Sequence, residues 1–359
     1  MKTILKSLFT LILTILLTSN FNTYSQVGEL GNMLAGGTED AQKLLQPYVT
    51  PAVNAFGAAL AGGWYNTAEP HKLGGFDITF TTSAAIVPQK YRTYTIDDSE
   101  LNYLKLGSGE NPETQTISGE GIGGPQIVYN FSGFQSPAFR MPEGINTRIV
   151  PAPMIQAGVG LIKGTDVMFR YLPNIKYKEN ELGLWGIGGR HDLKQWIPGV
   201  KRIPVLKLSL MYGYTKLHTF VDMDINPGTI GAGSLNVEGS NTWDDQYMKI
   251  WVKSHTLNLL IAADLKVVTF YGGIGFVTTE TNLKMEGEFP TVTLDETLQP
   301  VVVAINDPLD MRIKNQDGSI TKPRFNAGMR FKLAIVTLHF DYSWANYSVL
   351  SAGLGFSFR

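Results

Sequence analysis

Residues 336–344 read Val-Thr-Leu-His-Phe-Asp-Tyr-Ser-Trp, and their alternation is the clearest indication of the fold. Every second side chain, beginning with Val336, is apolar, and the side chains between them are polar. Successive side chains of a β-strand point to opposite faces, so the segment has one apolar and one polar face. The same alternation occurs in Phe325–Leu333 and in Leu350–Phe358. The pattern predicts three consecutive two-faced strands at the C-terminal end.

Strand length and connections distinguish a membrane barrel from a soluble antiparallel sheet, which also has one polar face. Membrane strands need about 9–11 residues, against about 5–6 in globular sheets, and the segments here approach the longer figure. Very short connections such as Lys163–Thr165 alternate with polar stretches such as 89–147 and 287–322. Short periplasmic turns and long external loops are typical of outer-membrane barrels.

We therefore expect an all-β fold, an antiparallel transmembrane β-barrel of about ten strands. The predicted strands lie near residues 74–87, 148–162, 166–178, 181–190, 203–217, 246–264, 267–285, 323–333, 335–345 and 347–358. An even number of strands returns both termini to the periplasm. The two long polar stretches can each hold a further hairpin, since segments such as Val301–Val303 favour strands, and about 12 to 14 strands stay open.

The N-terminus has the layout of a secretory signal peptide. Lys2 and Lys6 form a basic region before an apolar run from Leu8 to Leu17, which is too short to span a membrane as a helix. We expect cleavage after Ser25, where the small-x-small rule is satisfied. The sequence thus predicts signal-peptide-dependent export to the outer membrane of a Gram-negative bacterium.

Composition excludes several classes of protein. The chain contains no Cys, which excludes a lipoprotein anchor, a disulfide framework, a thiol nucleophile and a Cys-ligated metal. The 30 Lys+Arg less the two signal lysines leave 28 against 31 Asp+Glu, and the resulting formal charge of −3 gives no sign of nucleic-acid binding. Charged residues make up only 17% of the chain and aromatic residues 11%, and the chain contains 38 Gly. This composition suits a β-protein in lipid.

A different kind of segment precedes the barrel. Between Thr38 and Leu60, apolar residues recur at three- and four-residue spacing, which predicts a helix. Pro47 and Pro51 are expected to split or kink this helix, because proline removes a backbone donor and clashes with the preceding turn. We expect a signal peptide at 1–25, an N-terminal helical plug segment at 26–73 and the barrel at 74–359. The plug segment is expected at the periplasmic entrance, filling the lumen or packing beneath it.

The residues that follow this helix are Trp-Tyr-Asn-Thr-Ala at positions 64–68, before the first alternating strand. This passage resembles the FadL-like family of outer-membrane transporters for long-chain fatty acids and other hydrophobic compounds. There, an N-terminal hatch leads into the first strand through a Trp-Tyr-Asn-Pro-Ala motif, and Thr67 stands at the proline position. Segments 75–79 and 190–198 also resemble an uncharacterised Bacteroidetes outer-membrane family.

The resemblance implies a porin-like passive transporter for small hydrophobic compounds, gated by residues about 27–70. The substrate-binding residues that it suggests are Phe56, Trp64, Tyr65 and Asn66. The alternative is a structural or adhesive closed barrel that acts through long extracellular loops. In that case polar lumen-facing side chains fill the interior, namely Arg330, Lys332, His339 and Asp341. The expected partners are outer-membrane lipid, the barrel-assembly machinery and hydrophobic small molecules, with no nucleic acid.

Other patterns that can carry chemistry favour plainer interpretations. Residues 119–124 satisfy G-x-G-x-x-G, but no helix signal follows, so a flexible external loop is favoured over a dinucleotide site. His339, Asp341 and Ser343 share one polar strand face, which favours a lumen hydrogen-bond network over acid–base catalysis. No H-E-x-x-H or G-x-S-x-G motif occurs. We expect no enzyme, no catalytic residue, no cofactor and no metal site.

Three features of the sequence concern the surface of the protein. One predicted external loop contains four aspartates, namely Asp222, Asp224, Asp244 and Asp245. We favour the interpretation that they are solvated acids over the alternative that they bind Ca²⁺. Residues 191–198 are expected to form a one-turn helix, with Trp196 and Ile197 packed against the barrel rim rather than binding a partner. Aromatic pairs near strand ends predict interfacial girdles, namely Tyr212 and Tyr214, Tyr342 and Trp344, and Phe356 and Phe358.

Overall fold

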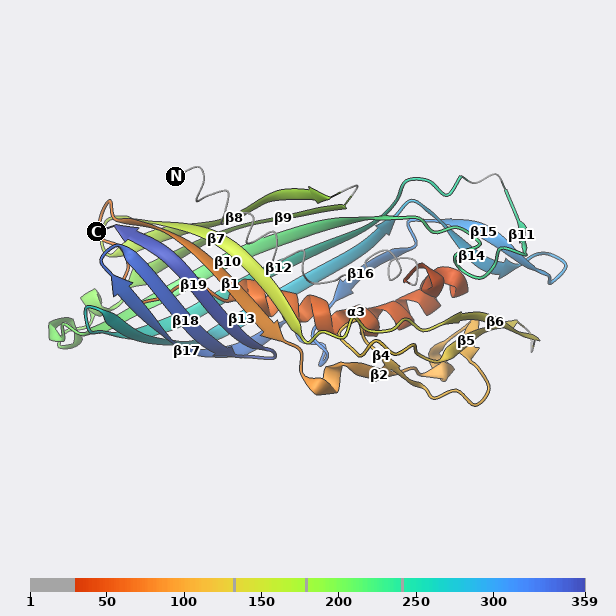
Figure 1. Ribbon diagram of the computed structural model, residues 1–359, viewed down its shortest axis with the longest axis horizontal. Coiled ribbons are helices and arrows are strands. Elements are labelled where there is room, and N and C mark those ends of the chain that lie inside the picture. Colours follow the sequence, from red (N-terminus) through yellow and green to blue (C-terminus); the bar gives the residue numbers. More distant parts are fainter. Residues whose placement is uncertain (1–29, 132–133, 178–179, 240–241, 359) are drawn as a thin grey trace.

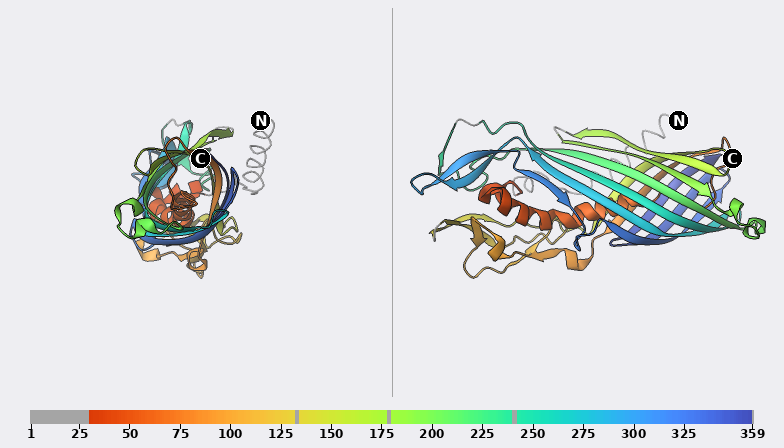
Figure 2. Two further views of the ribbon diagram at one scale, coloured as in Figure 1. Left: turned by 90° about the vertical axis from the view of Figure 1, so that its left-hand side faces the viewer. Right: turned by 180° about the vertical axis from the view of Figure 1, so that it is seen from behind.

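The computed structural model describes residues 30–131, 134–177, 180–239 and 242–358, so the expected signal peptide lies outside the described residues. Ten antiparallel strands form a barrel wall around one long helix (Figures 1 and 2). In chain order they are β1 (Phe76–Ile86), β7 (Ile149–Gly160), β8 (Thr165–Tyr177), β9 (Asn180–Asp192), β10 (Leu206–Met223), β12 (Gln246–Asp264), β13 (Val268–Glu286), β17 (Thr321–Leu333), β18 (Val336–Trp344) and β19 (Ser348–Phe358). Pairing of β12 with β13 and of β1 with β19 closes the ring. The predicted transmembrane barrel is confirmed.

The alternation in the sequence corresponds to the two faces of the wall. On β18, Phe340 and Trp344 are exposed on the outer surface, whereas His339 and Ser343 are buried inside. An outer surface covered with large apolar side chains is what a bilayer requires of a barrel. The aromatic residues Tyr212, Trp344, Phe356 and Phe358 belong to this outward-facing set.

The two ends of the barrel differ in their connections. Phe76 at the start of β1 pairs with Phe358 near the C-terminus, and their rings stack 4.8 Å apart. This end also carries the turns at 161–164, 265–267 and 334–335. The three longest connections, 87–148, 224–245 and 287–320, lie at the opposite end. Since termini and short turns of bacterial barrels are periplasmic, we assign the long connections to the extracellular side.

The long connections form a structured cap rather than additional wall. Its elements are β2 (Thr93–Thr95), β3 (Leu104–Leu106), β4 (Glu113–Gln115), β5 (Gln126–Phe131), β6 (Phe134–Arg140), β11 (Asn236–Val237), β14 (Glu288–Leu294) and β15 (Pro300–Asn306). The hairpins expected in 89–147 and 287–322 therefore exist, but they form separate small sheets. Of the described strands outside the wall, only β16 (Leu309–Ile313) pairs with a wall strand, at the extracellular end of β13. The option of 12 to 14 wall strands is wrong.

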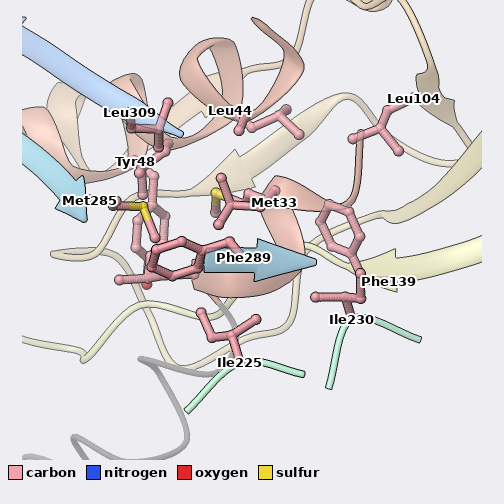
Figure 3. Packing of buried hydrophobic residues seen from close by; sticks show 14 of the residues in the cluster. Met33, Leu44, Tyr48, Leu104, Phe139, Ile225, Ile230, Met285, Phe289 and Leu309 are labelled. Atoms are coloured by element: carbon pink, nitrogen blue, oxygen red, sulfur yellow. The ribbon is translucent and has the colours of Figure 1, made fainter. Parts of the chain in front are cut away.

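The N-terminal residues form the core of this cap (Figure 3). Met33 in the 3-10 helix η1 (Met33–Gly36) packs with Phe289 and Ile225, which come from two different long connections. Leu44 and Tyr48 of the following helix belong to the same buried cluster. Because burial of apolar side chains drives packing, the cap depends on the segment that continues into the lumen.

Helix α3 (Gly37–Ala61) runs from the cap into the barrel, along the long axis of the molecule (Figures 1 and 2). Pro47 and Pro51 lie inside this one continuous element. The helix ends where Gly62 approaches Ser83 and Ser351, in the extracellular half of the wall. The expected position of the helix at the periplasmic entrance is therefore wrong, because apolar residues of its first half, such as Leu44 and Tyr48, pack against the cap. No helix among the described residues is long and apolar enough to cross a membrane.

Asp40 in the first turn of α3 joins the helix to the cap. Its buried carboxylate accepts hydrogen bonds from the backbone N–H groups of Asn102, Tyr103 and Leu104, at 2.7, 2.8 and 2.9 Å. Substitution Asp40→Ala removes these charge-assisted bonds, so we expect the three amides to exchange hydrogen about 30-fold faster or more. Hydrogen-exchange mass spectrometry measures this. The exposed control Glu113→Ala is expected to leave the exchange unchanged, and an equal acceleration in both variants would contradict the role of Asp40.

Candidate functional site

The residues after α3 fill the barrel between the helix and the periplasmic end. We call residues 62–72, which are the part of the N-terminal segment that follows α3, the plug. Trp64, Tyr65, Thr67 and Ala68 are all buried within the barrel. The chain then reaches the periplasmic rim, where β1 begins at Phe76. The plug is therefore a continuous stretch of chain without helix or strand, held by side chains of the wall.

Arg170 of β8 holds the extracellular end of the plug. Its guanidinium donates to the carbonyl oxygens of Leu60, at 3.0 Å, and Gly62, at 2.8 Å, and to Gln156 at 2.9 Å. It also lies 3.7 Å from the ring of Trp64, a close cation–π contact. A cation at a helix C-terminus satisfies carbonyl groups that have no partner within the helix. Arg170 thus fixes both the end of α3 and the turn into the plug.

Two glycines of the wall make room for Trp64. A Cβ at Gly188 of β9 would lie 2.7 Å from the indole ring, and one at Gly213 of β10 would lie 2.5 Å from it. Both distances are too short for any side chain. The indole is therefore packed between the guanidinium of Arg170 and bare backbone, which explains these two glycines on neighbouring strands.

A second arginine holds the middle of the plug. Arg324 of β17 donates to the Tyr65 hydroxyl at 3.0 Å, and this hydroxyl donates to Asn326 at 2.6 Å. Arg324 also donates to Ser343 at 2.7 Å. Nearby, Asp341 accepts from Tyr271 at 3.3 Å. These bonds tie the plug to the C-terminal strands of the barrel.

The periplasmic end of the plug is held by a buried ionic cluster. Arg190 of β9 donates to the Thr67 carbonyl and to Asp166 of β8, both at 2.5 Å. His71 of the plug contacts the same Asp166 carboxylate at 3.1 Å and lies 3.5 Å from Asp77. A buried carboxylate that meets an arginine and a histidine satisfies the usual requirement that buried charges be paired. The plug is thus fixed to the wall along its whole length.

An apolar cavity of about 440 Å³ lies on the extracellular side of the plug, between α3 and the wall. Its size suits a small ligand. The lining residues are Ala52, Val53, Phe56, Ile117, Ile145, Thr147, Ile149, Val150, Pro151, Ala152, Pro153, Leu172, Leu182, Leu184, Leu217, Thr219, Ile250 and Val252. Two threonines are the only polar residues among these described side chains.

The wall beside this cavity is open between β7 and β8. Ile155–Gly160 of β7 pair with residues 166–171 of β8. The extracellular halves of the two strands are not hydrogen-bonded to each other. Figure 1 shows the β8–β9 hairpin diverging from β7 toward the cap. Pro151 and Pro153 of β7 and Pro173 of β8 lie in these unpaired halves and have no N–H to donate. The antiparallel register, continued, would place Pro153 opposite Pro173, so the sequence prevents the strands from closing.

The structure separates the four residues suggested as a substrate site. Phe56 lines the apolar cavity, whereas Trp64 and Tyr65 lie in the plug and do not line it. Asn66 accepts a hydrogen bond from Arg330 at 3.3 Å. His339 and Asp341 are buried on the inner face of the wall, and Arg330 and Lys332 are half-buried there. The lumen is filled by the plug, and not by ion pairs among these four side chains.

Three further expectations can be placed. Gly119–Gly124 lies in the cap between β4 and β5 with no helix after it. Among the described residues no group of three or more His, Asp or Glu is arranged to hold a metal ion. Residues Lys194–Trp196 form the expected single turn. Trp196 is 64% exposed, so the expectation that it packs against the barrel rim is wrong. Its indole N–H instead donates to His191 at 2.9 Å, which leaves most of the ring outside.

A complete ring of paired strands with an apolar outer surface and a polar inner surface defines a transmembrane β-barrel of the bacterial outer-membrane type. The chain belongs to DUF6588, a family of unknown function, which matches residues 1–358. No curated protein matches the sequence.

Solved outer-membrane barrels are similar in outline. The translocator domain of the autotransporter NalP from Neisseria meningitidis is 10% identical, with 87% of this chain and 99% of that chain covered and a TM-score of 0.31. The toluene transporter TodX of Pseudomonas putida is 8% identical, with 89% and 97% covered and a TM-score of 0.26. The attachment protein Ail of Yersinia pestis, in complex with a heparin analogue, is 8% identical, with 80% and 98% covered and a TM-score of 0.26.

Proposed function

We propose that this protein is a passive outer-membrane transporter that delivers small, neutral, hydrophobic compounds sideways into the bilayer. The observation that carries the proposal is the apolar cavity beside the unpaired halves of β7 and β8. The cavity and the opening share residues, since Pro151, Pro153 and Leu172 belong to both. A molecule in the cavity therefore faces a wall without backbone pairing on its lipid side.

The lining favours a neutral substrate. No charged side chain is among the described residues that form the cavity, and its two hydroxyl groups belong to Thr147 and Thr219. Burial of a carboxylate without a partner is costly, whereas a hydrocarbon gains free energy in proportion to the apolar area removed from water. Hydrocarbons such as alkylbenzenes fit these surroundings better than ionised fatty acids.

The plug supports sideways rather than axial movement. Arg170, Arg324 and Arg190 fix it at three levels, so the straight path to the periplasm is filled. A hydrophobic compound that entered the cavity would leave through the opening toward lipid. Gating by the N-terminal segment and relationship to the Bacteroidetes family stay predictions.

Uptake measurements test the proposal. A Gram-negative strain without its own hydrophobic-compound porin is given this chain, and uptake of radiolabelled toluene is compared with that of radiolabelled oleate. We expect faster toluene uptake than in the strain without the chain, and a smaller effect on oleate. If neither uptake changes while the barrel is folded in the outer membrane, the transporter proposal fails. The closed adhesive barrel would then be favoured, because the long connections form a cap with its own buried core.

A further inference from the structure

A second cavity of about 440 Å³ opens at the periplasmic end, beneath the plug. We call it the vestibule. Residues Thr67 and Glu69–Lys72 of the plug form one side, and Pro204–Lys207 and the ends of β12 and β17 form the other. It shares no lining residue with the apolar cavity. Its chemistry is therefore independent of the transport proposed above.

Positive charge dominates the vestibule. Five cationic side chains line it, namely Lys72, Lys207, Lys266, Arg330 and Lys332, against the two carboxylates Glu69 and Asp264. Glu69 is already paired with Lys207 at 2.7 Å. Asp264 accepts from the Lys266 backbone N–H at 3.1 Å and from Thr269 at 3.3 Å. The cationic groups thus outnumber the acids that could neutralise them.

Several of these cations have no anionic partner. Within the described residues, Lys72, Lys266 and Lys332 form no ion pair. In this same part of the chain, the guanidinium of Arg330 donates to the neutral oxygens of Asn66 and Thr269, at 3.3 and 3.2 Å, and its buried Nε has no hydrogen-bond acceptor. A concave site with one sign of charge concentrates counter-ions of the other sign.

We propose that the vestibule binds a phosphate group. A guanidinium fork beside several lysines is the donor set that phosphate oxygens prefer, because charge-assisted hydrogen bonds to them are strong. The group can come from a free phosphate compound or from the headgroup of a phospholipid in the periplasmic leaflet. Since Lys207 also holds Glu69 and Arg330 also holds Asn66, the bound anion competes with two contacts of the plug.

Titration calorimetry on the full barrel in a neutral detergent tests the site. The probes are pyrophosphate and, separately, micellar dihexanoyl phosphatidic acid. We expect binding that weakens with added salt and that the pair Lys266→Gln and Lys332→Gln reduces about tenfold or more. Arg202→Gln is the matched control, because Arg202 is an exposed cation at the same end that does not line the vestibule.

Each outcome decides the question. Pyrophosphate binding that depends on Lys266 and Lys332 supports a site for free phosphate compounds. Binding of phosphatidic acid alone, with the same dependence, supports a lipid headgroup site. Binding of neither probe, or equal loss in the Arg202→Gln control, overturns the proposal. Heat-modifiable migration on gels confirms that each variant is a folded barrel.

Discussion

Substitution Ala152→Trp is expected to reduce toluene uptake to the level of cells that lack the protein. Ala152 is buried on β7, lines the apolar cavity and lies in the half of the strand that has no partner in β8. An indole at this position occupies the cavity and the inner side of the opening. Radiolabelled toluene uptake in whole cells measures the effect.

The same strand supplies a matched control. Ala157 lies five residues further along β7, in the paired part of the strand, and faces outward. Ala157→Trp adds the same side chain on the lipid side, where large apolar groups are expected, and should leave uptake unchanged. Equal uptake in both variants would show that the cavity is not on the route.

Substitution Arg170→Ala is expected to release the extracellular end of the plug. The change leaves the carbonyl groups of Leu60 and Gly62 without these donors in a buried site and removes the cation from the Trp64 ring. Buried groups left unpaired, together with the lost ring contact, should lower the free energy of unfolding by about 3 kcal/mol or more. Denaturant unfolding in detergent measures this loss.

Planar bilayers provide the second measurement on Arg170→Ala. We expect the protein to conduct little because the plug fills the lumen, and the variant to show larger and longer openings. Arg312→Ala is the control, since Arg312 is exposed and pairs with Glu280 in the cap region. Such surface pairs contribute little to stability. Unchanged conductance and stability in Arg170→Ala would contradict its assigned role in holding the plug.

Local alternation was sufficient to predict the wall. The strand expected at 335–345 is β18 at Val336–Trp344, and the one expected at 246–264 is β12 with the same bounds. A strand that separates lipid from a polar interior carries its two faces in its own sequence, so no distant information is needed. The strands in the long connections could be detected in the same way, but their exclusion from the wall could not.

The position of the helix and the arginine contacts depend on distant residues. Periodicity predicted a helix near 38–60, but the burial of Leu44 and Tyr48 in one cluster with Phe289 of the cap decides how deep it lies. Arg170 was missed although it alternates with apolar neighbours on β8, because its acceptors are carbonyl groups more than a hundred residues away. The prolines of β7 and β8 carried a usable signal, since proline is confined to unpaired edges of sheets.

Cross-linking β7 to β8 across the opening tests whether substrate leaves the barrel sideways. The chain has no Cys, so Pro153→Cys with Pro173→Cys introduces a unique thiol pair across the unpaired edges of β7 and β8. A disulfide or a short bis-maleimide would join the strands, and toluene uptake is measured before and after. We predict that uptake is lost on cross-linking and, for the disulfide, restored by reduction, whereas each single variant stays active under both conditions. Full uptake by the completely cross-linked barrel would contradict a sideways route.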